Sequence, residues 1–218
     1  MDSVDTYLVT QETLSPDRTT REIVEAAIAG GVDVVQVREK NAGAREQLEI
    51  TRDLRSLTQN AEVPLIVNDR VDVAKAADAD GVHLGDDDLP VAEAREQLGE
   101  GAIVGRSVST VAGAREAEAA GADYLGVGAV FATDSKDDLE DDEYDIGLEP
   151  IEAINEAVDV PIVAIGGITR DNATEVVRAG ADGVAVISAI TAADDPEAAT
   201  RDLKSAVRDG KKTLEGQQ

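Results

Sequence analysis

Residues 179–186 read AGADGVAV, and related stretches occur upstream as GGVDVVQV at 30–37, DADGVHLG at 78–85 and AGADYLGV at 120–127. Each places an aspartate directly before a mostly apolar run, and these aspartates, Asp33, Asp80, Asp123 and Asp182, are 47, 43 and 59 residues apart. Spacings of this size hold about two strand-plus-helix units each. The repeat therefore predicts strands 2, 4, 6 and 8 of a regular βα chain.

Short apolar runs rich in Val and Ile alternate with amphipathic segments along the chain, which is the pattern of βα units around a parallel sheet. The amphipathic segments include residues 20–30, 44–59 and 171–180. The expected strands are residues 5–10, 32–38, 64–68, 81–85, 102–106, 123–128, 161–167 and 183–188.

Eight such units in 218 residues predict one α/β domain over residues 1–218, folded as a closed (β/α)8 TIM barrel. An open doubly wound sheet is the alternative. It would carry a GxGxxG fingerprint after the first strand, where this chain reads TQETLSPD at 10–17.

The chain is strongly acidic, with 46 Asp and Glu against 20 Lys and Arg and a formal charge of -26. This charge repels nucleic acid phosphates and anionic lipid, so we expect neither as a partner. No apolar run approaches the roughly 20 residues of a membrane-spanning helix, and the acidic N-terminus is unlike a secretory signal. We therefore expect a cytoplasmic protein. Self-association into a homo-oligomer is left open.

Only 6 of the 20 cationic residues are lysines. This composition resembles that of cytosolic proteins from salt-accumulating organisms. The chain also has one histidine, His83, and no cysteine, which excludes disulfides and Cys/His zinc sites. We expect His83 to be a packed or hydrogen-bonded residue rather than a catalyst.

Polar residues follow several of the expected strands, at the barrel end where active sites form. In QVREK at 36–40, Gln36, Arg38 and Lys40 share one face of an extended segment and predict an anion clamp. Asp69 follows the third strand, and the acids 86–88 follow the fourth. Mg²⁺ typically takes one or two carboxylates together with water and phosphate oxygens, so this rim predicts a magnesium site. Solvated rim acids are the alternative.

A second group of residues predicts another anion site on the same rim. Gly166 and Gly167 follow the seventh expected strand and allow backbone amides to approach a phosphate closely. Hydroxyls and a lysine follow the sixth strand, where an acidic insertion lies at about 134–146. Two anion sites on one barrel mouth favour two phosphorylated small-molecule substrates. No nucleophile system based on Ser, Cys or His is expected.

Taken in order, QVREK, NDR at 68–70, HLGDDDLP at 83–90, TDSK at 133–136, IGGIT at 165–169 and ADGVAVISAI at 181–190 resemble the motifs of the thiamine-phosphate synthase family. This family condenses 4-amino-5-hydroxymethyl-2-methylpyrimidine diphosphate with 4-methyl-5-(2-phosphoethyl)thiazole. The resemblance implies a transferase of thiamine biosynthesis that releases pyrophosphate by a dissociative substitution, assisted by one Mg²⁺ per site, in a halophilic organism.

The resemblance also implies roles for single residues, by their positions in the matching motifs. The pyrimidine diphosphate would be held by Gln36, Arg38, Lys40, Asn68, Ser107 and Lys136, of which Arg38, Lys40, Ser107 and Lys136 would act in catalysis. The magnesium ligands would be Asp69 and Asp88. The thiazole phosphate would be held by Thr133, Ser135, Gly167, Ile187 and Ser188.

Two other functions are weighed against this one. A thiazole tautomerase-type isomerase would need a base and would have no site for a diphosphate and a metal. A non-catalytic phosphate-binding barrel would bind ligand without turnover. Magnesium-dependent release of pyrophosphate separates all three.

Overall fold

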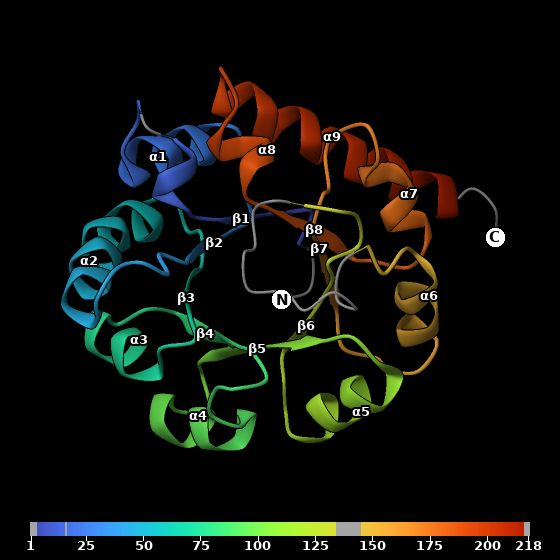
Figure 1. The fold of residues 1–218 in the computed structure, drawn as a ribbon, viewed down its shortest axis with the longest axis horizontal. Coiled ribbons are helices and arrows are strands. Elements are labelled where there is room, and N and C mark those ends of the chain that lie inside the picture. The colour runs from blue at the N-terminus through green and yellow to red at the C-terminus, as the bar shows by residue number, and fades with distance from the viewer. Residues whose placement is uncertain (1–3, 16, 134–144, 216–218) are drawn as a thin grey trace.

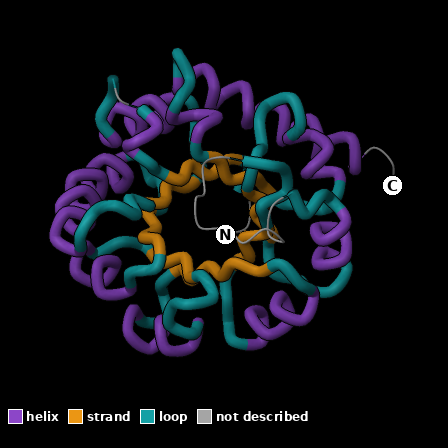
Figure 2. The backbone as a smooth tube through the Cα atoms, in the orientation of Figure 1, coloured by secondary structure: helices purple, strands orange, loops and turns teal. Residues whose placement is uncertain are grey.

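A computed structural model of the 218-residue chain describes residues 4–15, 17–133 and 145–215. Within these residues, eight parallel strands pair in chain order, and β8 pairs with β1 to close the barrel. Figures 1 and 2 show the strands as an inner ring and the helices as an outer ring. The prediction of a closed (β/α)8 barrel is confirmed, and the open sheet is excluded.

The strands are β1 (Thr6–Val9), β2 (Val34–Val37), β3 (Leu65–Asn68), β4 (Gly81–Leu84), β5 (Ile103–Val108), β6 (Tyr124–Val127), β7 (Ile162–Ile165) and β8 (Gly183–Val186). The helices are the 3-10 turn η1 (Glu12–Leu14), α1 (Thr20–Ala29), α2 (Ala44–Asn60), α3 (Val71–Ala77), α4 (Val91–Leu98), α5 (Val111–Ala119), α6 (Glu149–Asn155), α7 (Ala173–Arg178), α8 (Ser188–Thr191) and α9 (Pro196–Glu215). Helix α9 packs against both α7 and α1, so the last helix covers the place where β8 pairs with β1.

The C-terminal ends of three strands lie two residues from the expected bounds, as does the start of β2, and the other strand bounds agree within one residue. β5 runs to Val108 because Ser107 and Val108 still pair with β6, so Ser107 lies inside the strand rather than after it. β7 ends at Ile165 because the next two residues are glycines with positive φ, which leave the extended conformation. β8 ends at Val186, and Ser188 instead begins helix α8.

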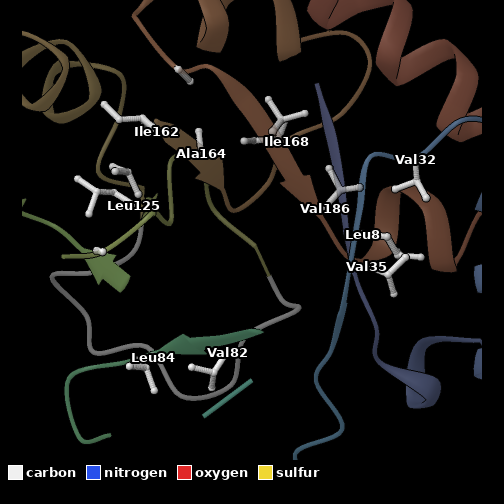
Figure 3. Packing of buried hydrophobic residues seen from close by; sticks show 14 of the residues in the cluster. Leu8, Val32, Val35, Val82, Leu84, Leu125, Ile162, Ala164, Ile168 and Val186 are labelled. Atoms are coloured by element: carbon white, nitrogen blue, oxygen red, sulfur yellow. The ribbon is translucent and has the colours of Figure 1, made fainter. Parts of the chain in front are cut away.

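The apolar side chains form two layers, one on each side of the strand ring. The outer layer fills the space between strands and helices, and Figure 3 shows several of its members, among them Leu8, Val82 and Leu125. The inner layer fills the barrel lumen and includes Tyr7 and Tyr124. The alternation of side chains along each strand produces both layers from the same short segments.

The repeated aspartates lie at the N-terminal ends of their strands, where they accept hydrogen bonds from the backbone of the preceding strand. The Oδ2 atom of Asp80 lies 2.7 Å from Leu65 N, and that of Asp123 lies 2.7 Å from Val104 N. The corresponding distances are 2.9 Å from Asp33 to Thr6 N and 2.8 Å from Asp182 to Ile162 N. The repeat is therefore a structural device, on the face of the barrel opposite the candidate site.

Candidate active site

Four of the six residues expected to bind the pyrimidine diphosphate meet at the C-terminal end of the barrel. Gln36, Arg38, Asn68 and Ser107 line one pocket that opens from the lumen. The side chains of Gln36 and Arg38 are buried, whereas Lys40 lies beyond the end of β2 and is exposed. The fold thus brings together residues of β2, β3 and β5, although Gln36 and Ser107 are 71 positions apart in the sequence.

Arg38 is fixed by the loop that follows β1. Its backbone N–H donates to Thr10 Oγ1 at 3.1 Å, and its Nη1 donates to Gln11 Oε1 at 3.2 Å. Arg38 is only 6% exposed. A buried cation at a pocket wall is suited to binding an anion.

Glu39 faces away from this pocket and is a residue that the sequence reasoning missed. Its Oε2 accepts from Glu12 N at 3.0 Å, and its Oε1 accepts from Thr20 Oγ1 at 3.4 Å. Burial raises the pKa of Glu39, and hydrogen bonds to the carboxylate oppose that rise. The carboxylate joins the end of β2 to η1 and α1, which supports the loop that holds Arg38.

Asp69 and Asp88, the expected magnesium ligands, are hydrogen-bonded to each other. Burial, followed by the charge and hydrogen bond of Asp88, raises the pKa of Asp69 to about 6. The positive charges of Lys40 and Arg38 act in the opposite direction, so both cations lie within electrostatic reach of the pair. The carboxyl group of Asp88 is held in place by Gly85 N–H, 2.6 Å from its Oδ2.

The backbone at Asp69 adopts the left-handed conformation, with φ of 63°, which is uncommon outside glycine. Its N–H donates to His83 O at 2.8 Å, so the neighbouring strand β4 holds this conformation. Unfavourable backbone angles that persist at a strand end are typical of functional positions.

The donor set of this acid pair fits Mg²⁺. Two half-buried carboxyl groups face each other, and Mg²⁺ typically binds one or two carboxylates and keeps other positions for water and phosphate. Among the described residues, no group of three or more His, Cys, Asp or Glu gathers, so a cage built entirely of protein ligands is not present there. Asp86 is exposed, and its carboxylate pairs with Arg106 at 2.5 Å.

Four of the five residues expected to bind the thiazole phosphate line an adjoining cavity of about 610 Å³, which shares Ile165 and Ala185 with the first pocket. Its wall includes Thr133, Gly166, Gly167, Ile187 and Ser188. Positive φ values of 104° and 60° at the two glycines turn the chain sharply after β7. The volume is that of a site for a small ligand.

The turn after the two glycines is closed by Asn172. Its Nδ2 donates to Gly167 O at 3.1 Å, and its Oδ1 accepts from Thr169 N at 2.7 Å. Ser135, Lys136 and most of the acidic insertion at 134–146 lie outside the described residues.

His83 is hydrogen-bonded on both ring nitrogens, as the prediction of a hydrogen-bonded side chain requires. Nδ1 lies 2.9 Å from Tyr124 OH, and Nε2 lies 2.9 Å from Ser107 Oγ. The sequence reasoning missed Tyr124 and its partner Tyr7. A usable signal existed, because the chain has three tyrosines and one phenylalanine, and two of these four aromatic residues fall inside expected strands.

Another cavity, of about 640 Å³, lies at the opposite end of the barrel and is lined by Arg55, Asp80 and Ile103 among others. That end of the fold is associated with stability rather than with catalysis. Among the described residues, no helix is long and apolar enough to span a membrane.

Comparison with known proteins gives consistent results. The pattern of a family described as thiamine monophosphate synthase matches residues 6–190. The thiamine-phosphate synthase of the halophilic archaeon Haloarcula marismortui is 65% identical over 207 residues, covering 95% of this chain and 98% of that protein. The thiamine-phosphate synthase of Chloroflexus aurantiacus is 54% identical over 201 residues, covering 92% and 91%. The solved structure of thiamine phosphate pyrophosphorylase from Pyrococcus furiosus has a TM-score of 0.86 at 44% identity, covering 96% and 98%.

Proposed function

The chain belongs to the thiamine monophosphate synthase family, and we propose that its barrel mouth condenses 4-amino-5-hydroxymethyl-2-methylpyrimidine diphosphate with 4-methyl-5-(2-phosphoethyl)thiazole. The products are thiamine phosphate and pyrophosphate, which makes the reaction a transfer in thiamine biosynthesis. One observation carries the proposal: an acid pair with nearby cations and an adjoining diglycine cavity share one barrel mouth. Two such sites fit two phosphorylated substrates.

On the diphosphate side, Arg38 and Lys40 bind the diphosphate and stabilise the negative charge that grows on the leaving pyrophosphate. The burial of Arg38 supports this role, because a charge–charge interaction is stronger where water is excluded. Gln36, Asn68 and Ser107 orient the pyrimidine end of the same substrate. Lys136 is assigned to the diphosphate by its motif alone.

Asp69 and Asp88 would hold one Mg²⁺. When bound, this ion supplies Lewis-acid stabilisation of the pyrophosphate oxygens. The hydrogen bond between the two carboxyl groups supports the assignment, since it shows that both can reach one point.

The bond between the methylene carbon and the diphosphate oxygen breaks first, and the amino-substituted ring stabilises the resulting cation. The thiazole nitrogen then attacks the methylene carbon. That nitrogen has a lone pair and no proton to lose, so the step needs no strong base. A mouth in which His83 already has hydrogen-bond partners on both nitrogens agrees with this chemistry.

On the other side, Thr133, Gly167, Ile187 and Ser188 hold the thiazole phosphate, the last two largely through backbone amides, and Ser135 is assigned by its motif. The turn closed by Asn172 keeps the diglycine segment in its positive-φ conformation, which is suited to binding an anion through backbone N–H groups. A cytoplasmic location and the absence of nucleic acid and membrane partners stay predictions.

The test is an assay in molar KCl with Mg²⁺ and both substrates, followed by quantification of pyrophosphate and thiamine phosphate. We expect the two products in equal amounts, and neither when one substrate is omitted. A tautomerase-type isomerase would release no pyrophosphate. A non-catalytic barrel would bind the thiazole phosphate without turnover, and either result would overturn the proposal.

A further inference from the structure

Four side-chain hydrogen bonds cross the barrel lumen in one continuous line. Gln36 Nε2 donates to Tyr7 OH at 2.8 Å, and Tyr7 OH lies 2.8 Å from Tyr124 OH. Tyr124 OH lies 2.9 Å from His83 Nδ1, and His83 Nε2 lies 2.9 Å from Ser107 Oγ. The line, which we call the lumen relay (Gln36, Tyr7, Tyr124, His83 and Ser107), joins two residues that face the candidate pyrimidine pocket from β2 and β5.

The direction of the relay follows from the donors available. An amide nitrogen can only donate, so Tyr7 accepts from Gln36, and the single proton of Tyr7 needs another acceptor. Among the described residues, the remaining partner of Tyr7 OH is Tyr124 OH, so Tyr7 donates there. By the same reasoning Tyr124 donates to His83 Nδ1.

This direction fixes the tautomer of His83. Because Nδ1 accepts, the proton of the neutral ring sits on Nε2 and is donated to Ser107 Oγ. The hydroxyl proton of Ser107 is then left for a ligand, since Ser107 makes no second side-chain hydrogen bond to a described residue. At the other end, Gln36 uses its nitrogen in the relay, so its amide oxygen is left as an acceptor.

The lumen keeps the relay in this arrangement. Tyr7 and Tyr124 are each 1% exposed, and burial raises the pKa of both phenols, so both keep their protons. The rings fit because two neighbouring positions are glycines: a Cβ on Gly105 would lie 2.1 Å from Tyr124 Cζ, and one on Gly126 would lie 2.9 Å from His83 Cε1. The hydrogen bonds of the relay would run in the opposite direction only if the Gln36 amide rotated by 180° and presented its oxygen to Tyr7.

We propose that the lumen relay determines specificity by presenting an acceptor at Gln36 and a donor at Ser107, with Tyr124 and His83 as positioning residues. This pair offers an acceptor to the amino group of an aminopyrimidine and a donor to one of its ring nitrogens. A 4-oxo pyrimidine offers the reverse, a carbonyl acceptor beside an N–H donor. The relay therefore selects the amino form. The choice of ligand rests on the proposed function, but the polarity of the relay does not.

The polarity is tested on the ligand-free protein by ¹⁵N NMR of the histidine ring in untagged protein at alkaline pH, where imidazole is neutral. His83 is the only histidine, so a single ring gives every signal. We expect the Nε2–H tautomer. Observation of the Nδ1–H tautomer would overturn the proposal, whether or not the protein makes thiamine phosphate.

Two matched variants locate the source of the polarity, since each removes one phenol oxygen. Tyr124→Phe removes the donor to Nδ1 and is expected to reduce the Nε2–H population, whereas Tyr7→Phe leaves that donor in place and is expected to keep the tautomer. An unchanged tautomer in Tyr124→Phe contradicts the proposal. If this variant does not fold, the wild-type spectrum still decides the polarity.

Specificity is tested by comparing the 4-amino substrate with its 4-oxo analogue as pyrimidine diphosphates. A site built on buried polar groups rejects a ligand of reversed polarity strongly, so we expect wild-type kcat/KM to differ by about 100-fold or more. Tyr124→Phe should raise the KM for the amino substrate about tenfold, leave the KM for the thiazole phosphate unchanged, and narrow the discrimination. Equal use of both analogues by the wild type, or a rise in both KM values together, would contradict a specificity role.

Discussion

Among the candidate site residues, Asp69 combines several unfavourable features. Its carboxyl group is half-buried, hydrogen-bonded to a second carboxyl group and attached to backbone in the left-handed conformation. Burial and the neighbouring carboxyl group both destabilise the ionised form of Asp69, and the left-handed backbone is unfavourable for the folded state. A bound cation would offset the first two effects. Neighbouring carboxylates that depend on a cation are a physical signature of a metal site.

The raised pKa of Asp69 predicts a pH dependence for magnesium. Protons and Mg²⁺ compete for the same oxygens, so the apparent affinity for Mg²⁺ should fall as pH decreases through about 6, the pKa of Asp69 in the metal-free protein. Titrations with Mg²⁺ at pH 5, 6, 7 and 8 would measure this. An affinity that is constant over this range would contradict the shared-proton arrangement.

The same shift has a consequence for stability with a definite sign. The folded-state pKa lies above the ordinary aspartate value of 3.8, so the folded protein binds more protons between about pH 4 and 6. Without metal, the contribution of Asp69 to stability is therefore largest below about pH 4 and is lost as pH rises through about 6. Added Mg²⁺ should offset this loss at neutral pH.

At the scale of elements, the repeated aspartates connect strands to one another and to the helices. Asp80 also pairs with both terminal nitrogens of Arg55 on α2, at 2.9 and 3.0 Å, and Asp123 pairs with Arg95 on α4 at 2.7 Å. Asp182 accepts the same type of backbone bond, but no ion pair with a described residue accompanies it. Asp182 can therefore be compared with Asp80 to separate the effect of the ion pair from that of the backbone hydrogen bond.

We predict that Asp80→Asn destabilises the fold by about 1–3 kcal/mol, because Arg55 loses its charged partner while Asn can still accept from Leu65 N. Asp182→Asn is the matched control and should cost about 1 kcal/mol or less. Urea unfolding measures both values. KM values should stay unchanged in the folded protein, and equal destabilisation by the two variants would count against the ion-pair explanation.

The elements could be predicted from sequence because local pattern determines them. The aspartate-before-strand repeat and the apolar runs identified all the strands, and the largest errors in the bounds, of two residues, fell at the ends of β5, β7 and β8 and at the start of β2. At the end of β5, pairing with β6 extends the strand, and such pairing is not a property of the local sequence. Motif positions likewise identified Asp69 and Asp88 as candidates to share one site.

The lumen relay could not be predicted in this way. Tyr7 and Tyr124 are separated by 117 positions, and their contact exists only because the barrel closes and because Gly105 and Gly126 leave room. Glu39 was missed for a related reason: its partners lie on η1 and α1, and an acid is unremarkable in a chain with 46 of them. Burial, rather than residue type, distinguishes Glu39 from most of the other acids.

For the whole molecule, the dominant property is the charge of -26. Like charges distributed over a compact barrel repel one another, and the distance over which they do so falls from about 10 Å at 0.1 M salt to about 3 Å at 1 M. Ion pairs such as Arg21 with Asp53 offset only part of this repulsion, because both side chains are exposed.

We therefore predict that the thermal unfolding temperature rises by several degrees between dilute buffer and molar KCl, and that most of the rise occurs at the lower salt concentrations. Sucrose at equal molarity is the control, because it is excluded from protein surfaces without screening charge. An unfolding temperature that does not respond to KCl would contradict the account of the surface.

The proposal that Asp69 and Asp88 form the magnesium site of a synthase is tested by Mg²⁺-dependent thiamine phosphate formation in three proteins. The wild type is compared with Asp69→Asn, which keeps the side-chain shape and tolerates the left-handed backbone, and with Asp86→Asn, which removes an equal charge from the same rim. We predict Mg²⁺-dependent synthesis by the wild type and by Asp86→Asn, and a loss of about 100-fold or more in Asp69→Asn, the range found when one charge-stabilising group is removed. Full activity of Asp69→Asn, or wild-type synthesis that does not depend on Mg²⁺, would contradict the claim.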